Sequence, residues 1–394
     1  MMKRRGGMVL ASAVTVAAAL ASTAGASSTA ATRSQGISCG STLKIAMVAP
    51  FTGGAGFLGN EQLSWAKYAV KTLAPKYGLK ISLVTGDTPV EQGPAPAQTL
   101  AQKFVADKSV VAVIGPSTSG AVAASTKTYF AAGLAHISES ATRTSLTKGA
   151  NLEGTPAFFR VIPGDYIQGP TDANFMIKQG AKNVVLFDFQ EPYSQGLSDA
   201  AEAVLKAKGV TTTRQSVSNT TTDFSSFVTK VPSSADFVFF PTQKPGDAQN
   251  FAQQLIEQGK KAKVFGGDGS NDASQFKVPG SYVSNFAPDI SGIAADKAII
   301  AGWQKDNPSA KLGSFGPPSY LAAQVAMAAI KLACTQGKGT INDRRSVLRN
   351  VKKVRVPNSI LGGDFRFSTK SNDPLNAKFY IFQIQSNGSY KLVG

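Results

Sequence analysis

Short apolar segments alternate with segments of helical periodicity along most of the 394-residue chain, and this alternation constrains the fold more than any other feature. Short apolar runs predict buried strands, and the runs of about 10–15 residues between them have the spacing of amphipathic helices. Such alternation predicts βαβ units with right-handed connections around a parallel sheet. In the first block we expect strands at 43–49, 79–84, 110–114 and 134–138, and helices at 62–73, 97–107 and 119–130.

The same alternation repeats in a second block, which therefore has an α/β core of its own. Two α/β lobes with a ligand cleft between them are the expected architecture. Here we expect strands at 158–162, 184–189, 237–240 and 263–265, and helices at 167–179, 195–208 and 248–259. Beyond about residue 279 we expect helices at 294–305, 319–335 and 343–351, then strands at 365–367 and 378–385.

Composition excludes several classes of protein. A hydrophobic content of 42% is too high for a disordered chain. Two cysteines and one histidine, His136, are too few for a disulfide-dense scaffold or a four-cysteine zinc site, and they leave few options for histidine-based catalysis. No segment after the N-terminal region offers about 18 consecutive apolar residues, which argues against a multi-span membrane protein.

The N-terminus has the features of a secretory signal peptide. Lys3, Arg4 and Arg5 precede an apolar stretch at 8–20, and the small residues at 24–26 fit a cleavage site. We therefore expect residues 1–26 to be removed on export, to the periplasm or outside the cell, and residues 27–42 to form a flexible segment. An uncleaved anchor is the alternative. Lipidation of Cys39 is a second one, although residues 36–38 lack the usual leucine.

The chain is basic, with a formal net charge of +17. The signal peptide carries three positive charges and no negative ones, so its removal leaves +14. The positive charges are scattered and are not interleaved with aromatic residues. This pattern is typical of a solvated surface, and we expect no nucleic-acid partner. Only small clusters occur, at 260–263, 344–345 and 352–355.

The two cysteines are far apart in the sequence. Cys39 lies just before the first expected strand, and Cys334 lies near the end of an expected helix. An oxidising compartment favours a disulfide between them. Such a bond would tie the N-terminus to a distant element and constrain a very long loop.

Residues 54–59 read GAGFLG and match the G-x-G-x-x-G pattern of dinucleotide-binding loops. The segment follows a strand and precedes a helix, and Asp87 ends the next strand. However, residues 50–52 separate the strand from the glycines, so the first glycine cannot form the tight turn at the strand end. A glycine-rich loop at the rim of a cleft is the favoured interpretation, and we expect no cofactor.

Five segments together resemble one known family. The most specific are VIGPSTSGAVAASTKTYF at 113–130 and HISESATRTSLT at 136–147. Supporting segments are FFRVIPGDYIQGP at 158–170, VVLFDFQEPYSQGL at 184–197 and VFGGDGSND at 264–272. In order and spacing, from about residue 43 to the C-terminus, they resemble the periplasmic substrate-binding proteins of ABC importers, of the branched-chain amino-acid (Leu/Ile/Val) type.

The resemblance implies a type I periplasmic binding protein fold, in which two Rossmann-like lobes with central parallel sheets are joined by a three-segment hinge. It places the hinge crossings near 160–163, 284–289 and 356–361. Lobe 1 is then expected to combine 43–161 with 288–357, and lobe 2 to combine 162–287 with 358–394.

Residues 117–120 lie between a strand end and a helix start. Hydroxyls there can cap the helix, and the free N–H groups attract a carboxylate. Plain capping without a ligand is the alternative, but the resemblance implies a ligand contact at Ser119. It also implies that Ser140 offers backbone groups and that Thr142 offers its hydroxyl and N–H. The family usually has proline where this chain has Glu139, which adds a carboxylate near the rim and puts the charge of the ligand in question.

The second lobe would close over this wall. The resemblance implies that Asp268 pairs with the ammonium group of the ligand and that Tyr193 faces the cleft. Considered without the resemblance, Asp268 between glycines would be a turn residue and Tyr193 a core residue. Further possible contacts are Phe57, Leu58, Ser117, Thr118, Ala141, Phe240 and Tyr320.

The sequence therefore predicts a monomeric, exported solute-binding protein that delivers a small amino acid to a membrane permease. A sensor module without a transport role is an alternative, as is an amide, urea or aromatic-acid ligand. A hydrolase using Ser119 and His136 is a third alternative, but His136 lies within an apolar strand and no G-x-S-x-G turn is present. We expect no enzymatic activity.

Overall fold

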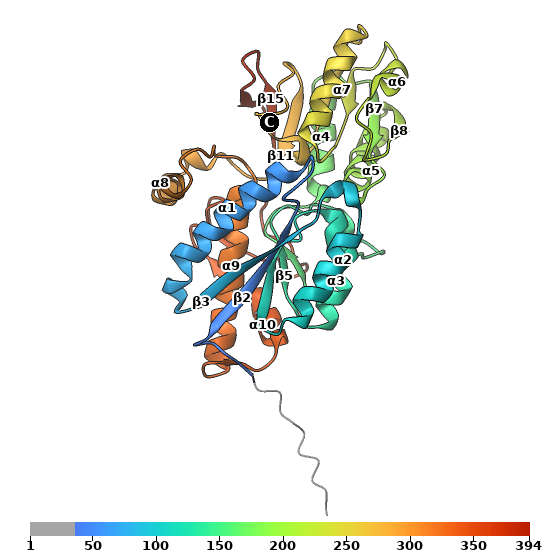
Figure 1. Ribbon diagram of the computed structural model, residues 1–394. Coiled ribbons are helices and arrows are strands. Elements are labelled where there is room, and N and C mark those ends of the chain that lie inside the picture. Colours follow the sequence, from blue (N-terminus) through green and yellow to red (C-terminus); the bar gives the residue numbers. More distant parts are fainter. Residues whose placement is uncertain (1–35) are drawn as a thin grey trace, which may run out of the picture. The chain divides into compact units, whose positions relative to one another are not determined.

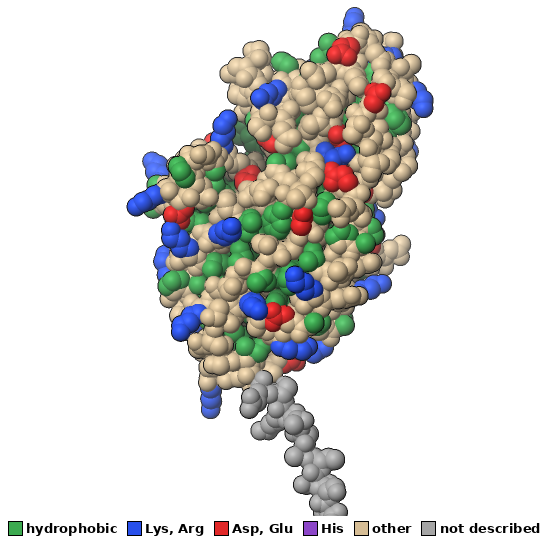
Figure 2. Space-filling view, in the orientation of Figure 1, with side chains coloured by type: hydrophobic (Ala, Val, Ile, Leu, Met, Phe, Trp, Pro, Cys, Tyr) green, Lys and Arg blue, Asp and Glu red, His purple; other side chains and the backbone are tan. Residues whose placement is uncertain are grey.

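The computed structural model describes residues 36–394, which build two large β-sheets flanked by helices, together with two small two-stranded sheets (Figure 1). The predicted signal peptide and residues 27–35 lie outside the described residues. Among the described helices, none combines the length and the apolarity that a membrane span requires. On the face shown in Figure 2, Lys and Arg side chains are spread over the surface rather than gathered in one patch.

The first sheet is fully parallel and has the strand order β3-β2-β4-β5-β6. Its central strand β4 has the sequence VVAVI, and every residue of it is buried, as expected for a strand covered on both faces. The strands are β2 (Thr42–Ala49), β3 (Lys80–Asp87), β4 (Val110–Ile114), β5 (His136–Ser138) and β6 (Phe158–Arg160).

Helices cover both faces of this sheet. In Figure 1, α2 and α3 lie on one side, and α1 and α9 lie on the other. The side of α1 and α9 holds the larger core, in which Trp65 stacks on Trp303 with ring centroids 4.6 Å apart. The helices are α1 (Gly56–Leu73), α2 (Ala95–Ala106), α3 (Ser119–Ala131), α8 (Lys297–Asp306), α9 (Gly316–Gln336) and α10 (Arg344–Val351).

The second sheet has the order β16-β15-β11-β10-β9-β7-β8, in which β15 and β16 are antiparallel additions to a parallel sheet. Phenylalanines dominate one side of it; Phe240 stacks on Phe251 at 4.3 Å. The strands are β7 (Asn183–Asp188), β8 (Thr211–Ser216), β9 (Phe237–Phe239), β10 (Lys263–Gly266), β11 (Tyr282–Asn285), β15 (Tyr380–Ile384) and β16 (Tyr390–Leu392). The helices are α4 (Asp165–Lys178), α5 (Pro192–Ala207), α6 (Ser225–Thr229) and α7 (Pro245–Glu257).

The sequence predicts a flexible segment at residues 27–42. The described part of this segment is instead held by contacts with distant residues. Strand β1 (Ile37–Ser38) pairs with β12 (Thr340–Ile341), and Cys39 forms a disulfide with Cys334 (S–S 2.02 Å). The predicted pairing of the two cysteines is therefore present. It leaves Cys39 without a free thiol, so this structure is incompatible with the lipidation alternative.

Residues 355–366 contain a separate two-stranded sheet. Strand β13 (Arg355–Val356) pairs with β14 (Phe365–Arg366), and Phe365 and Phe367 pack in the first core although the predicted second lobe contains them. The lobe boundaries stay a prediction. Short 3-10 helices occur at Pro75–Tyr77, Val90–Gln92, Thr144–Leu146, Asp268–Ser270, Ile290–Gly292 and Ala294–Asp296.

Candidate functional site

A small pocket lies where the carboxyl ends of the two parallel sheets face each other. This is the usual place for a ligand in open α/β sheets, because the loops after the strands converge there. The open space is about 10 Å³, which is room for about one water molecule, so the two walls approach each other closely. The pocket is lined by Leu58, Ser117, Thr118, Ser119, Ser140, Tyr193, Gln243, Asp268 and Gly269.

The N-terminus of α3 forms part of the first wall. Thr118 is its N-cap residue, and its Oγ1 accepts a hydrogen bond from the N–H of Ala121 over 3.4 Å. The N–H groups of the first turn, including that of Ser119, have no partner within the helix. Together with the helix dipole, they make this end of α3 favourable for a carboxylate.

The loop after β5 forms the rest of the first wall. The Ser140 hydroxyl donates to the carbonyl of Ser117 over 2.6 Å and accepts from Gln62 Nε2 over 2.9 Å. Thr142 is fully buried, and its Oγ1 has no hydrogen-bond partner among the described residues. Ala141 is also buried. Neither Ala141 nor Thr142 reaches the pocket surface.

The second wall is built around Tyr193 and Asp268. The Tyr193 hydroxyl donates to Asp268 Oδ1 over 2.9 Å and accepts from the N–H of Gly269 over 3.1 Å. Burial raises the pKa of Asp268 to about 6. Gly267 has to be glycine in this arrangement, because a Cβ there would overlap the Tyr193 hydroxyl.

Two further buried acids lie close to Asp268. Burial, assisted by the charge of Asp268, raises the pKa of Asp165 to about 8. Burial also raises the pKa of Asp172 well above its usual value. Asp172 Oδ2 accepts from the Ser284 hydroxyl over 3.0 Å, and Ser284 Oγ accepts from Gln168 Nε2 over 2.9 Å. Because Asp165 holds its proton at neutral pH, Asp268, whose pKa is the lower of the two, is the carboxyl that can carry negative charge towards a cationic group.

Sequence reasoning missed these acids, although a signal for them exists. Asp165, Gln168 and Asp172 follow one another at i, i+3 and i+7, so they share one face of α4. That face is buried, and polar residues at the spacing of a buried helical face indicate a functional or structural polar cluster. Gln243 and Gly269 in the pocket wall were also missed, and no sequence pattern marks them.

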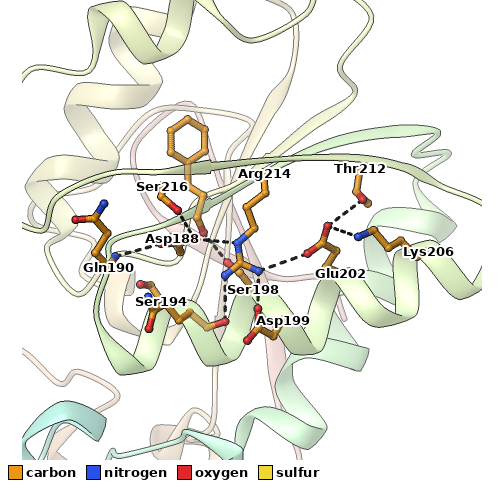
Figure 3. Close-up of polar contacts among 12 residues, drawn as sticks. Asp188, Gln190, Ser194, Ser198, Asp199, Glu202, Lys206, Thr212, Arg214 and Ser216 are labelled. Atoms are coloured by element: carbon orange, nitrogen blue, oxygen red, sulfur yellow. Dashed lines mark hydrogen bonds and ion pairs between the residues drawn. The ribbon is translucent and has the colours of Figure 1, made fainter.

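An ion network centred on Arg214 of β8 links the end of β7 to α5 (Figure 3), and Tyr193 lies in the first turn of that helix. Asp188, the last residue of β7, accepts from Arg214 Nε and from the Ser216 hydroxyl, each over 2.9 Å, and from the N–H of Gln190 over 3.2 Å. Beyond this turn, Glu191 caps α5 by accepting from the N–H groups of Tyr193 and Ser194, over 2.8 and 2.6 Å. The edge strand β8 and the start of α5 are thereby held in one arrangement.

Direct contacts join the two walls, and residues 36–394 form one unit. Arg143 donates from Nη1 to the carbonyl of Pro192, and Asn219 Nδ2 donates to the carbonyl of Val90 over 3.0 Å. A Cβ on Gly120 would lie 3.4 Å from Pro192. These contacts cross from loops of the first sheet to loops of the second.

The structure brings together most of the residues that the sequence predicts for the site. Ser119, Ser140, Tyr193 and Asp268 line the pocket, as do Leu58, Ser117 and Thr118 among the possible contacts. Three aromatic candidates lie elsewhere. Phe240 and Tyr320 are buried in the hydrophobic cores of the second and first sheets, and Phe57 packs edge-on against Phe315.

Glu139 does not lie near the rim, where the sequence placed it. It is fully buried behind the first wall, and its Oε1 lies 2.6 Å from Ser117 Oγ. Burial raises its pKa to about 7. The reason for the difference is that Glu139 contacts Ser117, which lies after a neighbouring strand and is itself bonded to Gln62 on α1, and no local sequence pattern reveals these contacts.

The hydrolase alternative finds no geometric support. His136 is fully buried, and its Nε2 lies 2.9 Å from Thr126 Oγ1 rather than at Ser119. Burial lowers the pKa of His136 to about 3. Ser119 Oγ instead accepts from the N–H of Arg143 over 3.2 Å.

The glycine-rich loop also differs from a phosphate-binding loop. The N–H of Gly54 donates to Glu91 Oε1 over 2.8 Å, so a carboxylate occupies the place that a phosphate would need. A Cβ on Gly54 would lie 2.7 Å from the side chain of Lys244, which places this loop against the second lobe. Among residues 36–394, no group of acidic, histidine or cysteine side chains has the arrangement of a metal site.

Several known proteins are similar to this chain in amino-acid sequence. A Leu/Ile/Val-binding protein, BraC3, from Rhizobium johnstonii is 26% identical over 81% of this chain and 86% of its own length. An amino acid binding protein from Pseudomonas aeruginosa is 25% identical over 88% of this chain and 91% of its own.

Solved structures support the fold. A leucine binding protein, LivK, from Thermotoga maritima has a TM-score of 0.78 at 21% identity, over 89% of this chain and 98% of its own. A solute binding protein from R. palustris in complex with benzoate has a TM-score of 0.78 at 19% identity, over 90% and 96%. These neighbours show a type I periplasmic binding protein fold. Since residues 42–389 match the periplasmic binding protein family, the chain belongs to that family.

Proposed function

We propose that this chain is the extracytoplasmic solute-binding component of an ABC importer, and that it binds a small amino acid between its two lobes. The observation that carries the proposal is the chemical difference between the two walls of the pocket. The first wall presents hydroxyls and the N-terminus of α3, and the second presents the carboxyl group of Asp268. A zwitterion has the matching charges, a carboxylate for the first wall and an ammonium for the second.

The apolar part of the ligand meets Leu58, which supports a small aliphatic side chain. The relatives whose names state a ligand, Leu/Ile/Val-binding proteins, support the same class. Micromolar affinity corresponds to roughly 8 kcal/mol, which several charge-assisted hydrogen bonds and apolar burial can supply.

The mechanism follows from the walls coming from different lobes. The ligand binds first to the loops at Ser117–Ser119 and Ser140, and closure of the second lobe then brings Tyr193 and Asp268. The closed form is favoured because it makes contacts with the ligand that the open form lacks. It then docks on a membrane permease. The protein acts as an exported monomer without catalytic activity.

The test is a thermal-shift and calorimetric panel on residues 27–394. L-leucine, L-isoleucine and L-valine represent the proposed class, and benzoate, acetamide and urea represent the alternatives. A ligand in large excess over its Kd raises the melting temperature by mass action. We expect a shift with at least one aliphatic amino acid. A shift with benzoate alone would transfer the assignment to aromatic acids, a class found among the structural neighbours.

A further inference from the structure

Glu139 lies in an unusual place for a carboxyl group. It follows β5 directly, its side chain is fully buried, and its Oε1 is 2.6 Å from Ser117 Oγ. Its Oε2 has no hydrogen-bond partner among the residues that the structure describes. No described Lys, Arg or His side chain forms a hydrogen bond or ion pair with it. An ionised carboxylate in such a place would be uncompensated, which costs several kcal/mol.

The number of hydrogen atoms available in the surrounding hydrogen-bond network indicates whether Glu139 is protonated or ionised. Ser117 Oγ has three oxygen neighbours: Glu139 Oε1 at 2.6 Å, Gln62 Oε1 at 2.7 Å and the carbonyl of Val48 at 3.2 Å. One hydroxyl carries a single hydrogen and can donate to only one of them. At least one of the two short contacts therefore needs a hydrogen from the other side.

Reversing the Gln62 amide does not supply this hydrogen without a loss elsewhere. As placed, Gln62 Nε2 donates to Ser140 Oγ over 2.9 Å, and the Ser140 hydroxyl donates to the carbonyl of Ser117 over 2.6 Å. With the amide reversed, Ser140 would face two acceptors with one hydrogen. A proton on Glu139 satisfies the short contacts: Glu139 donates to Ser117, Ser117 donates to Gln62 Oε1, and Gln62 donates to Ser140.

This chain of hydrogen bonds ends at the pocket, because Ser117 and Ser140 both line it. We propose that Glu139 is a positioning residue that must carry its proton for the carboxylate of the ligand to bind at Ser117–Ser119 and Ser140. The inference rests on the proposed function, since it assigns the carboxylate to this wall. In its neutral form Glu139 orients the Ser117 and Gln62 groups; in its ionised form it places a second negative charge behind the same wall.

Among the other titratable groups on neighbouring elements, Glu61, Asp87 and Arg160 are engaged elsewhere and Asp268 lies across the pocket. Both carboxyl oxygens of Asp165 have no hydrogen-bond partner among the described residues. Glu61 accepts from backbone N–H groups, Asp87 accepts from backbone N–H groups and from the Thr52 hydroxyl, and Arg160 pairs with the carboxylate of Asp373. The groups on the elements packed around Glu139 are Glu61 on α1, Asp87 at the end of β3, Arg160 on β6, Asp165 at the start of α4 and Asp268 across the pocket.

Two opposite pH dependences follow for the binding of a zwitterion. Affinity rises as pH increases through about 6, because Asp268 becomes the negative partner of the ammonium group. Affinity falls as pH increases beyond about 7, because Glu139 loses its proton and repels the carboxylate. On the falling side, binding takes up one proton, so the limiting slope is about tenfold in Kd per pH unit.

The experiment is calorimetric titration with L-leucine between about pH 5.5 and about pH 8.5, on the wild-type protein and on Glu139→Gln. The side-chain amide of glutamine can still donate a hydrogen bond to Ser117, and it stays neutral over the whole pH range. We expect the wild type to lose affinity towards high pH. We expect Glu139→Gln to keep its affinity there and to match the wild type near pH 6. A decline that survives in Glu139→Gln, or a wild type without a decline, would overturn the proposal.

Glu61→Gln is the matched control. Glu61 neighbours Gln62 on α1, and burial raises its pKa to about 7 as well, but it bonds to the N–H groups of Phe315 and Gly316. We expect Glu61→Gln to retain the wild-type decline. A flat profile in this control would mean that general destabilisation, rather than Glu139, sets the pH dependence.

A second measurement needs no ligand. In protein labelled with ¹³C-glutamate, the carboxyl resonance of Glu139 is identified by its loss in Glu139→Gln, and its shift reports protonation. We expect the protonated form near pH 6 and ionisation near pH 7. An ionised Glu139 at pH 6 would overturn the proposal. Absence of L-leucine binding at every pH contradicts the proposed function instead, and the resonance still decides whether Glu139 holds its proton.

Discussion

The hydroxyl of Tyr193 donates to Asp268 Oδ1 over 2.9 Å, at the point where the second wall of the pocket faces the first. Tyr193 lies in the first turn of α5 and Asp268 follows β10, so two elements of the second lobe converge on one carboxyl group. The bond orients Asp268 and leaves its remaining lone pairs for a positively charged partner.

Asp268→Asn therefore tests the ammonium partner. Removing the charge should weaken L-leucine binding by about 1.5–3 kcal/mol, or roughly 10- to 150-fold in Kd. Calorimetric titration near pH 7.5, where Asp268 is ionised, measures the change. The binding of 4-methylpentanoate, which is leucine without its ammonium group, should not be weakened.

Asp296→Asn is the matched control for this substitution. Asp296 is also almost fully buried, and burial raises its pKa to about 6, but it lies in a 3-10 helix away from the pocket. Its replacement should leave L-leucine affinity unchanged. Equal losses in both variants would show that Asp268 acts through stability and not as a ligand partner.

Arg214→Ala should loosen the turn between β7 and α5, which precedes Tyr193 (Figure 3). The substitution removes the bond to Asp188, which also holds the N–H of Gln190. We expect L-leucine affinity to fall about three- to tenfold, since one oriented hydrogen bond at the site is worth about 1 kcal/mol. Lys206→Ala, at the far end of the same network, should leave the affinity unchanged. An Arg214→Ala variant with wild-type affinity would contradict the positioning role of this network.

The ion pair between Arg160 and Asp373 should dominate the electrostatic part of stability. Both side chains are buried and lie 2.7 Å apart, so Asp373→Asn leaves an uncompensated buried guanidinium. We expect a loss of about 3–5 kcal/mol in the free energy of unfolding, measured with urea. In contrast, Asp306→Asn breaks a solvent-exposed pair with Lys71 and should cost less than about 1 kcal/mol. Similar losses in the two variants would contradict the difference in burial.

Stability should fall as pH rises from about 6.5 to about 8. Glu61, Glu139 and Asp165 have pKa values raised by burial to about 7, 7 and 8, so the folded protein holds protons that the unfolded chain has released. The stabilisation from such groups is fully present below the unfolded pKa values and is lost as pH passes the folded ones.

His136 has the opposite effect, because its pKa is lowered to about 3, but it acts only below its unfolded pKa of 6.5. Above pH 6.5 the buried acids therefore decide the sign. Melting temperatures measured at constant ionic strength should decrease across this window. A constant or rising melting temperature would show that these acids are ionised in the folded protein.

The sequence predicts the parallel strands well, because fully buried strands are continuous apolar runs. The run at 110–114 corresponds to β4 without any shift, and the run at 43–49 corresponds to β2 with one added residue. Strand β8 was not predicted, since its sequence TTTRQS has no apolar run. It is an edge strand held by the ion pairs of Arg214, and such pairs exist only after the chain has folded.

The site was predicted in part for a similar reason. Ser119, Ser140 and Asp268 each follow a strand, and the carboxyl ends of parallel strands converge, so their proximity follows from the fold. Gln243 and the buried position of Glu139 depend on contacts between distant segments. The aromatic candidates Phe240 and Tyr320 lie in the hydrophobic cores. A large ring packs against other rings more favourably than it lines a narrow polar pocket.

Diffraction from crystals grown with L-leucine tests the central claim most directly, because it reports both the place and the orientation of the ligand. The account predicts electron density between the two walls, with the carboxylate at the N–H groups around Ser119 and the ammonium towards Asp268. Density for L-leucine outside this pocket, or in the reverse orientation, would contradict it.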